Sequence, residues 1–234
     1  MSHFIYLVRH GEQQDAEQGL PDGPLSVKGA LQAKAIGERL ATVPFTGVWH
    51  SPLQRAEDTA RIIEKQLAGD VRSEPSALLF DCIPSGPTPD LPHAFEPFFG
   101  GVSEEEIDAG RAQMADAVTE FLAPARGDRH DLLITHNFVI GWFVREVLDA
   151  PEWRWLGVNQ ANCGLTIIRV RSAKPPVLVA HNDLGHLPPA LRSGMPIEQP
   201  FEPTVEAGVT AGYPAERRAV SQLPPEPYSV SSPE

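Results

Sequence analysis

The stretch Phe4-Ile5-Tyr6-Leu7-Val8-Arg9-His10-Gly11-Glu12 decides the fold. Its apolar run is short and rich in β-branched and aromatic residues, which is typical of a fully buried strand. Arg9 and His10 follow where that strand ends, and Gly11 permits a sharp turn. We therefore expect a guanidinium and an imidazole at the carboxyl edge of an α/β sheet, the edge where such folds bind ligands.

The composition restricts the class of protein. The chain has 234 residues, 41% of them hydrophobic, and it contains no apolar run long enough to cross a bilayer. A formal net charge of -12 disfavours nucleic acid and anionic membranes as partners, because both require a cationic face. Met1 leads directly into the first strand without a secretory signal, so a cytoplasmic location is expected. Cys82 and Cys163 lack CxxC spacing and are expected to be reduced thiols.

Hydrophobic periodicity predicts the other elements. Helices are expected over residues 26–41, 52–67, 103–122 and 138–148, with Ser26 capping the first, Pro52 opening the second and a capping box starting the third. Strands are expected over 47–50 and 131–135, with a hairpin over 165–181 that turns at Lys-Pro-Pro and a weaker extended segment over 71–79.

Two further segments are expected to lack regular structure. Residues 81–102 are rich in proline and glycine and are predicted to form a long loop. Residues 195–234 are acidic, rich in proline and poor in large apolar residues, so they are predicted to be a disordered tail. Residues 1–194 would then form a single α/β domain.

Two arginines and two histidines follow buried strands in a repeated pattern. Arg9 and His10 follow the first strand, Arg55 lies in the helix after the strand at 47–50, and His136 follows the strand at 131–135. This set suits phosphoryl transfer, since two guanidiniums can neutralise a phosphate while His10 attacks phosphorus. For that role His10 must be neutral, with its other ring N–H held by a carbonyl or carboxylate. His136, if protonated, would add a third cation.

The reaction also needs a proton donor for the leaving oxygen. Asp81 is the candidate, because the apolar run Leu78-Leu79-Phe80 before it could desolvate its carboxyl and raise the pKa. Glu12 and Glu96 remain alternatives.

Four motifs in order resemble the histidine phosphatase superfamily, in its phosphoglycerate-mutase-like branch, over roughly residues 3–190. They are the segments 7–11, 25–33, 51–59 and 134–137. The resemblance implies a three-layer α/β/α sandwich, His10 as the phosphorylated nucleophile, Arg9, Arg55 and His136 as the phosphate pocket, and neither metal nor cofactor.

Within the superfamily, segments 78–81, 162–166 and 181–189 are similar to the mitochondrial serine/threonine phosphatase subgroup. Asp81-Cys82 departs from the glutamate, often followed by glycine, that is common in the family. The sequence is expected to lack the membrane anchor of the mitochondrial relatives, so their location and partners are not expected to carry over.

Several alternatives stay open. A mutase must hold a second anion, yet residues 81–102 contain no Lys or Arg, which favours hydrolysis of a monoester with a neutral or apolar remainder. Phe95, Phe98 and Phe99 would then wall the substrate site. A phosphoglycerate-type phosphomutase and a catalytically silent binding protein are the competing hypotheses. The substrate could be a small molecule or a phosphoprotein, and the chain could form a homodimer. His181, Asp183 and His186 have a spacing that could suit a metal, although turn and strand-end roles are favoured.

Overall fold

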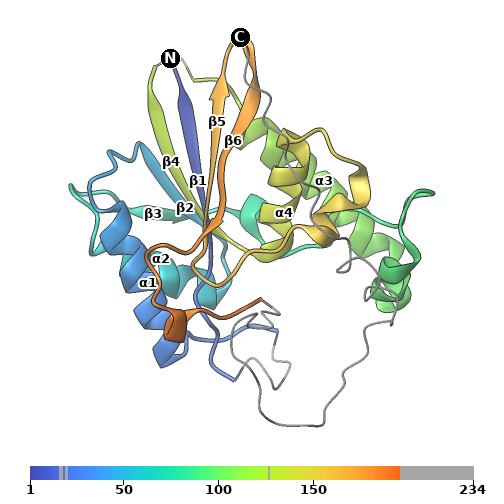
Figure 1. Ribbon diagram of the computed structural model, residues 1–234, viewed down its shortest axis with the longest axis horizontal. Coiled ribbons are helices and arrows are strands. Elements are labelled where there is room, and N and C mark those ends of the chain that lie inside the picture. Colours follow the sequence, from blue (N-terminus) through green and yellow to red (C-terminus); the bar gives the residue numbers. More distant parts are fainter. Residues whose placement is uncertain (16–17, 19–20, 126, 196–234) are drawn as a thin grey trace, which may run out of the picture. The chain divides into compact units, whose positions relative to one another are not determined.

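Strand β1 (His3–Arg9) lies inside a six-stranded sheet in the computed structural model, which describes residues 1–15, 18, 21–125 and 127–195. The strand order is β3-β2-β4-β1-β5-β6. The other strands are β2 (Gly47–His50), β3 (Ser73–Pro75), β4 (Arg129–Thr135), β5 (Leu165–Arg171) and β6 (Lys174–Asp183). Strands β1 to β4 pair in parallel, whereas β5 pairs antiparallel with β1 and β6 pairs antiparallel with β5. The carboxyl ends of β1, β2 and β4 therefore meet at one edge (Figure 1).

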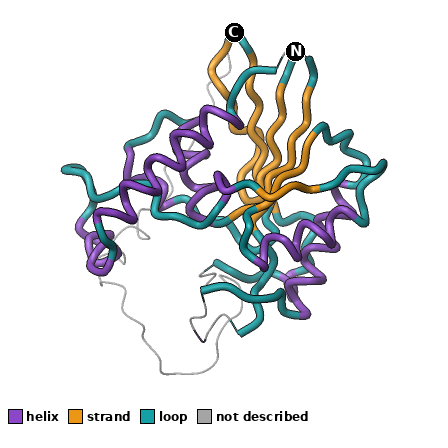
Figure 2. The backbone as a smooth tube through the Cα atoms, turned by 180° about the vertical axis from the view of Figure 1, so that it is seen from behind, coloured by secondary structure: helices purple, strands orange, loops and turns teal. Residues whose placement is uncertain are grey.

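Helices cover both faces of this sheet. Helices α1 (Val27–Leu40) and α2 (Gln54–Glu64) lie on one side, and α3 (Glu104–Phe121) and α4 (Asn137–Val147) lie on the other (Figures 1 and 2). The described ranges also contain the 3₁₀ helices η2 (Ala77–Leu79), η3 (His93–Gly101), η4 (Glu152–Gly157) and η5 (Pro189–Leu191). The predicted three-layer α/β/α architecture is confirmed.

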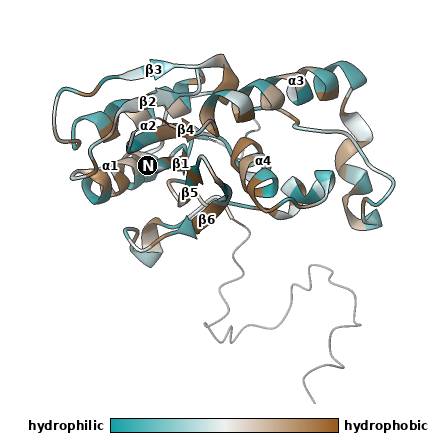
Figure 3. Cartoon of the chain, turned by 90° about the horizontal axis from the view of Figure 1, so that it is seen from above, coloured by the Kyte–Doolittle hydropathy of each residue, from teal (hydrophilic) through white to brown (hydrophobic). Residues whose placement is uncertain are grey.

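Successive side chains of a strand point to opposite faces of the sheet, so a separate hydrophobic core forms on each face. In β1, Ile5 and Leu7 face the cluster formed with α3 and α4, whereas Val8 packs with α1 and α2. All three side chains are fully buried. Such burial stabilises a fold by roughly 1.5–3 kcal/mol for each large apolar side chain, which is why a strand apolar on both faces must lie inside the sheet. Figure 3, seen from above, shows the two helix pairs on opposite sides of these strands.

The helix starts follow the predicted capping chemistry in two cases of three. Ser26 accepts a hydrogen bond from the Gly29 N–H, and Ser103 forms a reciprocal capping box with Glu106. The prediction that Pro52 opens a helix is wrong, because α2 begins at Gln54. Its first N–H donates instead to Asp22 Oδ2 at 2.9 Å, so the cap comes from the loop after β1.

Three segments differ from the prediction. The proline-rich stretch 81–102 contains the 3₁₀ helix η3, because Phe95, Phe98 and Phe99 pack against the core and order the chain. Pro175 and Pro176 lie within β6, not in the hairpin turn, since β6 is an edge strand and such strands tolerate missing donors. The extended segment 71–79 shortens to β3 followed by η2.

The predicted tail, residues 195–234, lies outside the described residues except for Met195. Within the described ranges, none of the helices combines the length and the apolar character needed to span a bilayer.

Candidate active site

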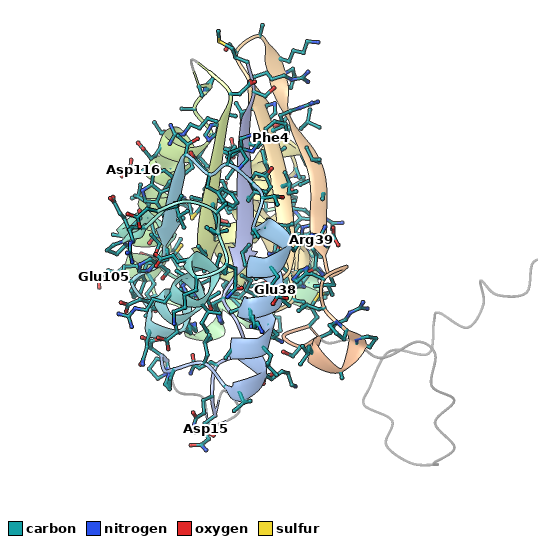
Figure 4. The ribbon with its side chains drawn as sticks, turned by 90° about the vertical axis from the view of Figure 1, so that its left-hand side faces the viewer. Phe4, Asp15, Glu38, Arg39, Glu105 and Asp116 are labelled. Atoms are coloured by element: carbon teal, nitrogen blue, oxygen red, sulfur yellow. The ribbon has the colours of Figure 1, made fainter. Side chains whose placement is uncertain are left out.

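The carboxyl edge of the sheet opens into a cavity of about 760 Å³. Figure 4 labels Phe4 near the opposite end of the sheet and Asp15, one of the lining residues, beyond the edge where the cavity lies. The lining consists of Arg9, His10, Glu12, Gln13, Gln14, Asp15, Pro21, Ser26, Arg55, Asp81, Asn162 and Gly194. Four of the five predicted site residues line this cavity, and the fifth, His136, contacts two of them.

His10 is buried at the end of β1 with its ring held in one orientation. Its Nδ1 donates to the Gly11 carbonyl at 2.8 Å, which leaves Nε2 as the acceptor of a 3.2 Å hydrogen bond from Arg55 Nε. Burial, reinforced by the charges of Arg9 and Arg55, holds the pKa of His10 well below 6.5, although the Gly11 hydrogen bond raises it. The imidazole is therefore neutral at pH 7, with a lone pair on Nε2.

Arg55 joins the other site residues. It lies in the first turn of α2 with only 7% of its side chain exposed. One terminal nitrogen, Nη2, donates to Asp81 Oδ2 at 3.1 Å and to His136 Nδ1 at 3.2 Å, while Nη1 donates to Asp22 Oδ1 at 3.3 Å. A single guanidinium thus contacts the imidazoles of His10 and His136 and the carboxyl of Asp81.

Arg9 supplies a second cation at the strand end. Its Nη1 donates to the carbonyls of Gln160 and Gly194 at 2.7 and 2.6 Å. Its buried Nε has no hydrogen-bond partner among the described residues. Buried donors are almost always paired, so this N–H is suited to an anionic ligand.

His136 precedes α4 and lies beside His10, with 5.1 Å between the ring centroids. Its Nδ1 accepts from Arg55, so Nε2 carries the proton and donates to Ser51 Oγ at 2.7 Å. Burial, followed by the proximity of His10, Arg55 and Arg9, lowers the pKa of His136 well below 6.5. Without a ligand His136 is therefore neutral, and it would become the third cation only where an anion held beside the ring favours its charged form.

The three candidate acids occupy different environments. Burial raises the pKa of Asp81 above its usual value, against the opposing charges of Arg55 and Arg9. Burial also raises the pKa of Glu12, but hydrogen bonds from Ser193, Ser26 and Lys28 outweigh it and the net shift is downward. Glu96 pairs with His93 on η3 and is not among the residues lining the cavity. Asp81 is thus the acid best suited to hold a proton.

Three positioning residues escaped the sequence analysis. Thr59 Oγ1 accepts from the Gly11 N–H and donates to the Arg55 carbonyl, which joins the motif at 7–11 to the motif at 51–59. Asn162 Nδ2 donates to the His10 carbonyl at 3.0 Å, and Ser51 holds His136. The only available signal was that each lies in or beside a motif at a strand end.

The predicted aromatic walls are wrong. Phe98 packs edge-on against Phe138 and Trp155, with ring centroids at 5.5 and 5.7 Å, and Phe95 packs on Trp153. These aromatics support the core beneath η3, and none of them lines the cavity.

The candidate metal ligands are engaged elsewhere. His181 Nδ1 lies 3.1 Å from Thr166 Oγ1, and His186 Nε2 donates to the Cys163 carbonyl. Across the described ranges, no three His, Cys, Asp or Glu side chains form a group able to hold a metal ion. Both cysteines are free thiols, as predicted, and burial, together with Asp81, raises the pKa of Cys82 to about 12.

This fold and this set of side chains define an α/β protein with a buried histidine between two arginines at the carboxyl edge of its sheet. The chain belongs to the histidine phosphatase superfamily (branch 1), whose family model matches residues 5–77 and 89–184. The named activities within this family include both phosphatases and phosphoglycerate mutases.

Two curated relatives illustrate that range. The chain is 32% identical over 195 residues to the mitochondrial serine/threonine-protein phosphatase Pgam5 of Caenorhabditis briggsae, a match covering 80% of this chain and 65% of that protein. It is 30% identical over 180 residues to a protein named probable phosphoglycerate mutase GpmB in Salmonella choleraesuis, covering 70% of this chain and 83% of that protein. The chain therefore spans just under two thirds of the Pgam5 relative.

Solved structures support the fold alone. YhfR of Bacillus stearothermophilus matches with a TM-score of 0.62 at 23% identity, covering 79% of this chain and 98% of that one. A phosphoserine phosphatase of Entamoeba histolytica, solved with phosphoserine, matches with a TM-score of 0.57 at 20% identity, covering 79% and 99%.

Proposed function

We propose that this chain is a phosphatase that hydrolyses a phosphomonoester through a phosphohistidine on His10. The observation that carries the proposal is the His10 ring: Nδ1–H is held by the Gly11 carbonyl, and the Nε2 lone pair faces Arg55. A neutral imidazole fixed in this tautomer is a nucleophile already oriented for attack.

In the first step, His10 Nε2 attacks phosphorus and the bond from phosphorus to the leaving oxygen breaks. Arg9 and Arg55 stabilise the charge on the transferring phosphoryl group, and His136 adds a third positive charge when the bound anion favours its protonated form. Asp81, whose pKa burial raises, gives its proton to the leaving oxygen so that an alcohol departs.

In the second step, the carboxylate of Asp81 takes a proton from water. The resulting hydroxide oxygen forms a bond to phosphorus, the bond between phosphorus and Nε2 breaks, and inorganic phosphate leaves. His10 returns to its neutral state and Asp81 is protonated again, so the cycle closes without a metal ion in any step.

The charges of residues 81–102 favour hydrolysis over isomerisation. A mutase has to hold a second anion while the phosphoryl group moves, and this segment contains no Lys or Arg. The name of the Pgam5 relative agrees with a phosphatase, while that of GpmB keeps a phosphomutase as the second candidate. A silent binding protein would not need both histidines and both arginines.

The test is a panel of phosphomonoesters assayed with the wild type and with His10→Ala. We expect the wild type to release inorganic phosphate and His10→Ala to lose at least about a thousandfold in kcat/KM, because the covalent route is removed. Isomerisation of a phosphoglycerate without phosphate release would favour the mutase. Absence of turnover on every substrate would favour the binding protein.

A further inference from the structure

A second cavity, of about 520 Å³, adjoins the phosphate-binding cavity. The two share Pro21, Arg55 and Asp81, so the proposed proton donor borders both cavities, while His10 lines the first. We call this second space the α3 cavity, since its far side is formed by α3. Its apolar lining includes Leu53, Phe80, Ile83, Ala109 and Phe138.

The walls of the α3 cavity are built to keep their shape. Gln113 on α3 donates to the Phe80 carbonyl at 2.8 Å and to the Leu78 carbonyl at 3.3 Å, which ties the chain before Asp81 to the helix. Gly110 lets α3 approach the segment at Ile83, because a Cβ at that position would lie 2.0 Å from the Ile83 carbonyl oxygen. The cavity is therefore largely preformed.

Phe80 gives this cavity an unusual apolar surface. Its side chain is 41% exposed although the residue lies between the buried Leu79 and the site residue Asp81. An exposed aromatic ring at the mouth of a cavity is a surface suited to contact with an apolar ligand.

The charges around the α3 cavity are predominantly negative. Among the described residues that line it, Arg55 is the cation, whereas Asp22, Asp81 and Glu106 are acids. Arg55 is also already engaged by Asp22 and Asp81. A substrate group with a further negative charge would meet repulsion from the carboxylates here, with no second cation to offset it.

We propose that the α3 cavity binds the group that carries the phosphate, and that this group is uncharged, apolar and at least the size of an aromatic ring. The assignment rests on the proposed phosphatase activity. With phosphate between Arg9 and Arg55, the leaving oxygen faces Asp81, and the remainder of the substrate extends past it toward Phe80. Substrates with a second anion, such as a phosphoglycerate, fit this arrangement poorly.

Two matched substitutions on α3 test the assignment. Ala109 lines the cavity and is exposed on the helix, so Ala109→Phe fills the space without disturbing the core, while Ala112→Phe places the same ring on an exposed position of α3 outside the lining. We expect Ala109→Phe to lower kcat/KM for 1-naphthyl phosphate about tenfold or more, and to change that for ethyl phosphate less than about twofold, because ethyl does not reach the cavity. Ala112→Phe should leave both values at the wild-type level.

A second pair of variants tests the charge argument. Glu106→Gln removes a carboxylate from the cavity and keeps an acceptor for the capping box, whereas Glu105→Gln removes one from the outer side of α3 (Figure 4). We expect Glu106→Gln, and not Glu105→Gln, to raise kcat/KM for phosphate release from 3-phosphoglycerate by about twofold to tenfold.

The outcomes separate this inference from the proposed function. Suppose that the wild type hydrolyses ethyl phosphate, and that Ala109→Phe lowers kcat/KM for neither substrate or for both equally. The α3 cavity is then not the subsite, and the phosphatase proposal stands. If the wild type prefers 3-phosphoglycerate to 1-naphthyl phosphate, the proposed substrate class is wrong. If no substrate releases phosphate, the proposed function itself fails.

Discussion

The hydrogen bond from His10 Nδ1 to the Gly11 carbonyl determines which ring nitrogen can react. With Nδ1 occupied as a donor, Nε2 keeps its lone pair and points at Arg55. Burial lowers the pKa of His10, and the same cations that can neutralise a phosphate lower it further and so help to keep the ring neutral. One arrangement of charges thus prepares both the nucleophile and the pocket.

At Asp81 we expect the effect of substitution to depend on the leaving group. Asp81→Asn removes the proton donor, which matters more for an alkyl alcohol than for a phenol, because a phenolate leaves without help. Alkyl phosphates should therefore slow by about a hundredfold or more, and aryl phosphates by much less. Comparing kcat/KM, which reports the first step and not hydrolysis of the phosphohistidine, on the two substrate classes checks this, and an equal loss for both would remove Asp81 from the proton-donor role.

Arg55 should not tolerate replacement by another cation. Lysine keeps the charge but cannot contact His10, His136 and Asp81 at once, because those contacts use the planar fork of the guanidinium. We expect Arg55→Lys to lower kcat/KM by about a hundredfold, with the fold intact by circular dichroism. Arg61→Lys, on the exposed side of the same helix, is the control, and a similar loss there would count against this account.

Single residues were predictable from sequence where their position alone brings them to the site. Arg9 is the last residue of β1, and His10 and His136 directly follow buried strands, so parallel strands bring all three to one edge. Thr59 and Asn162 were missed because they act by hydrogen bonds between segments far apart in the chain. The aromatic walls were misplaced because nothing in the sequence shows that Phe98 packs on Trp155.

At the scale of elements, helix α2 depends on a cap from another part of the chain. Leu53 provides no side-chain cap, and Asp22 accepts from the Gln54 N–H while also contacting Arg55. The loop after β1 therefore stabilises the helix start that positions Arg55. The N–H with a capping acceptor is that of Gln54, and the acceptor, Asp22, lies 32 residues earlier in the chain. The helix therefore begins at Gln54 and not at Pro52.

We expect Asp22→Ala to destabilise the protein by about 1 kcal/mol, the usual cost of losing a helix N-cap. Asp22→Asn keeps an acceptor and should lose less. Urea unfolding of both variants measures the difference, with the exposed Asp70→Ala as the control. Equal stability of Asp22→Ala and the wild type would mean that the cap contributes nothing.

At the scale of the molecule, the sheet brings together motifs that lie far apart in the chain. β1 lies between β4 and β5, so segments that are distant in sequence meet at one edge. The buried strands and the α/β class were predictable from apolar patterns. The strand order and the pairing of the hairpin with β1 were not, because register and neighbours depend on packing across the whole sheet.

Two neutral histidines in one buried site should make the protein sensitive to acid. The folded pKa values of His10 and His136 lie well below 6.5, so the unfolded chain binds more protons as the pH falls through that value. Stability is then fully present above about pH 6.5 and is lost below it. The raised pKa of Asp81 acts in the opposite direction, in the lower range where carboxyls titrate.

Urea unfolding at several pH values checks this prediction. Between about pH 7.5 and about pH 5.5, the wild type should lose roughly 2 to 3 kcal/mol more than a variant carrying both His10→Asn and His136→Asn. Parallel pH dependence in the two proteins would show that these histidines are not held neutral by the fold.

The most direct test of the central claim is to trap phosphate on His10. The reaction uses an aryl phosphate labelled in its phosphoryl group and is quenched rapidly without acid. We expect the wild-type chain to carry label that survives alkali and is released by mild acid. The label should map to the peptide that contains His10. Asp81→Asn should accumulate more of it, since its hydrolysis step is slowed, and His10→Ala should carry none. Turnover with no label on the wild type or on Asp81→Asn, or label that persists in His10→Ala, would contradict the account.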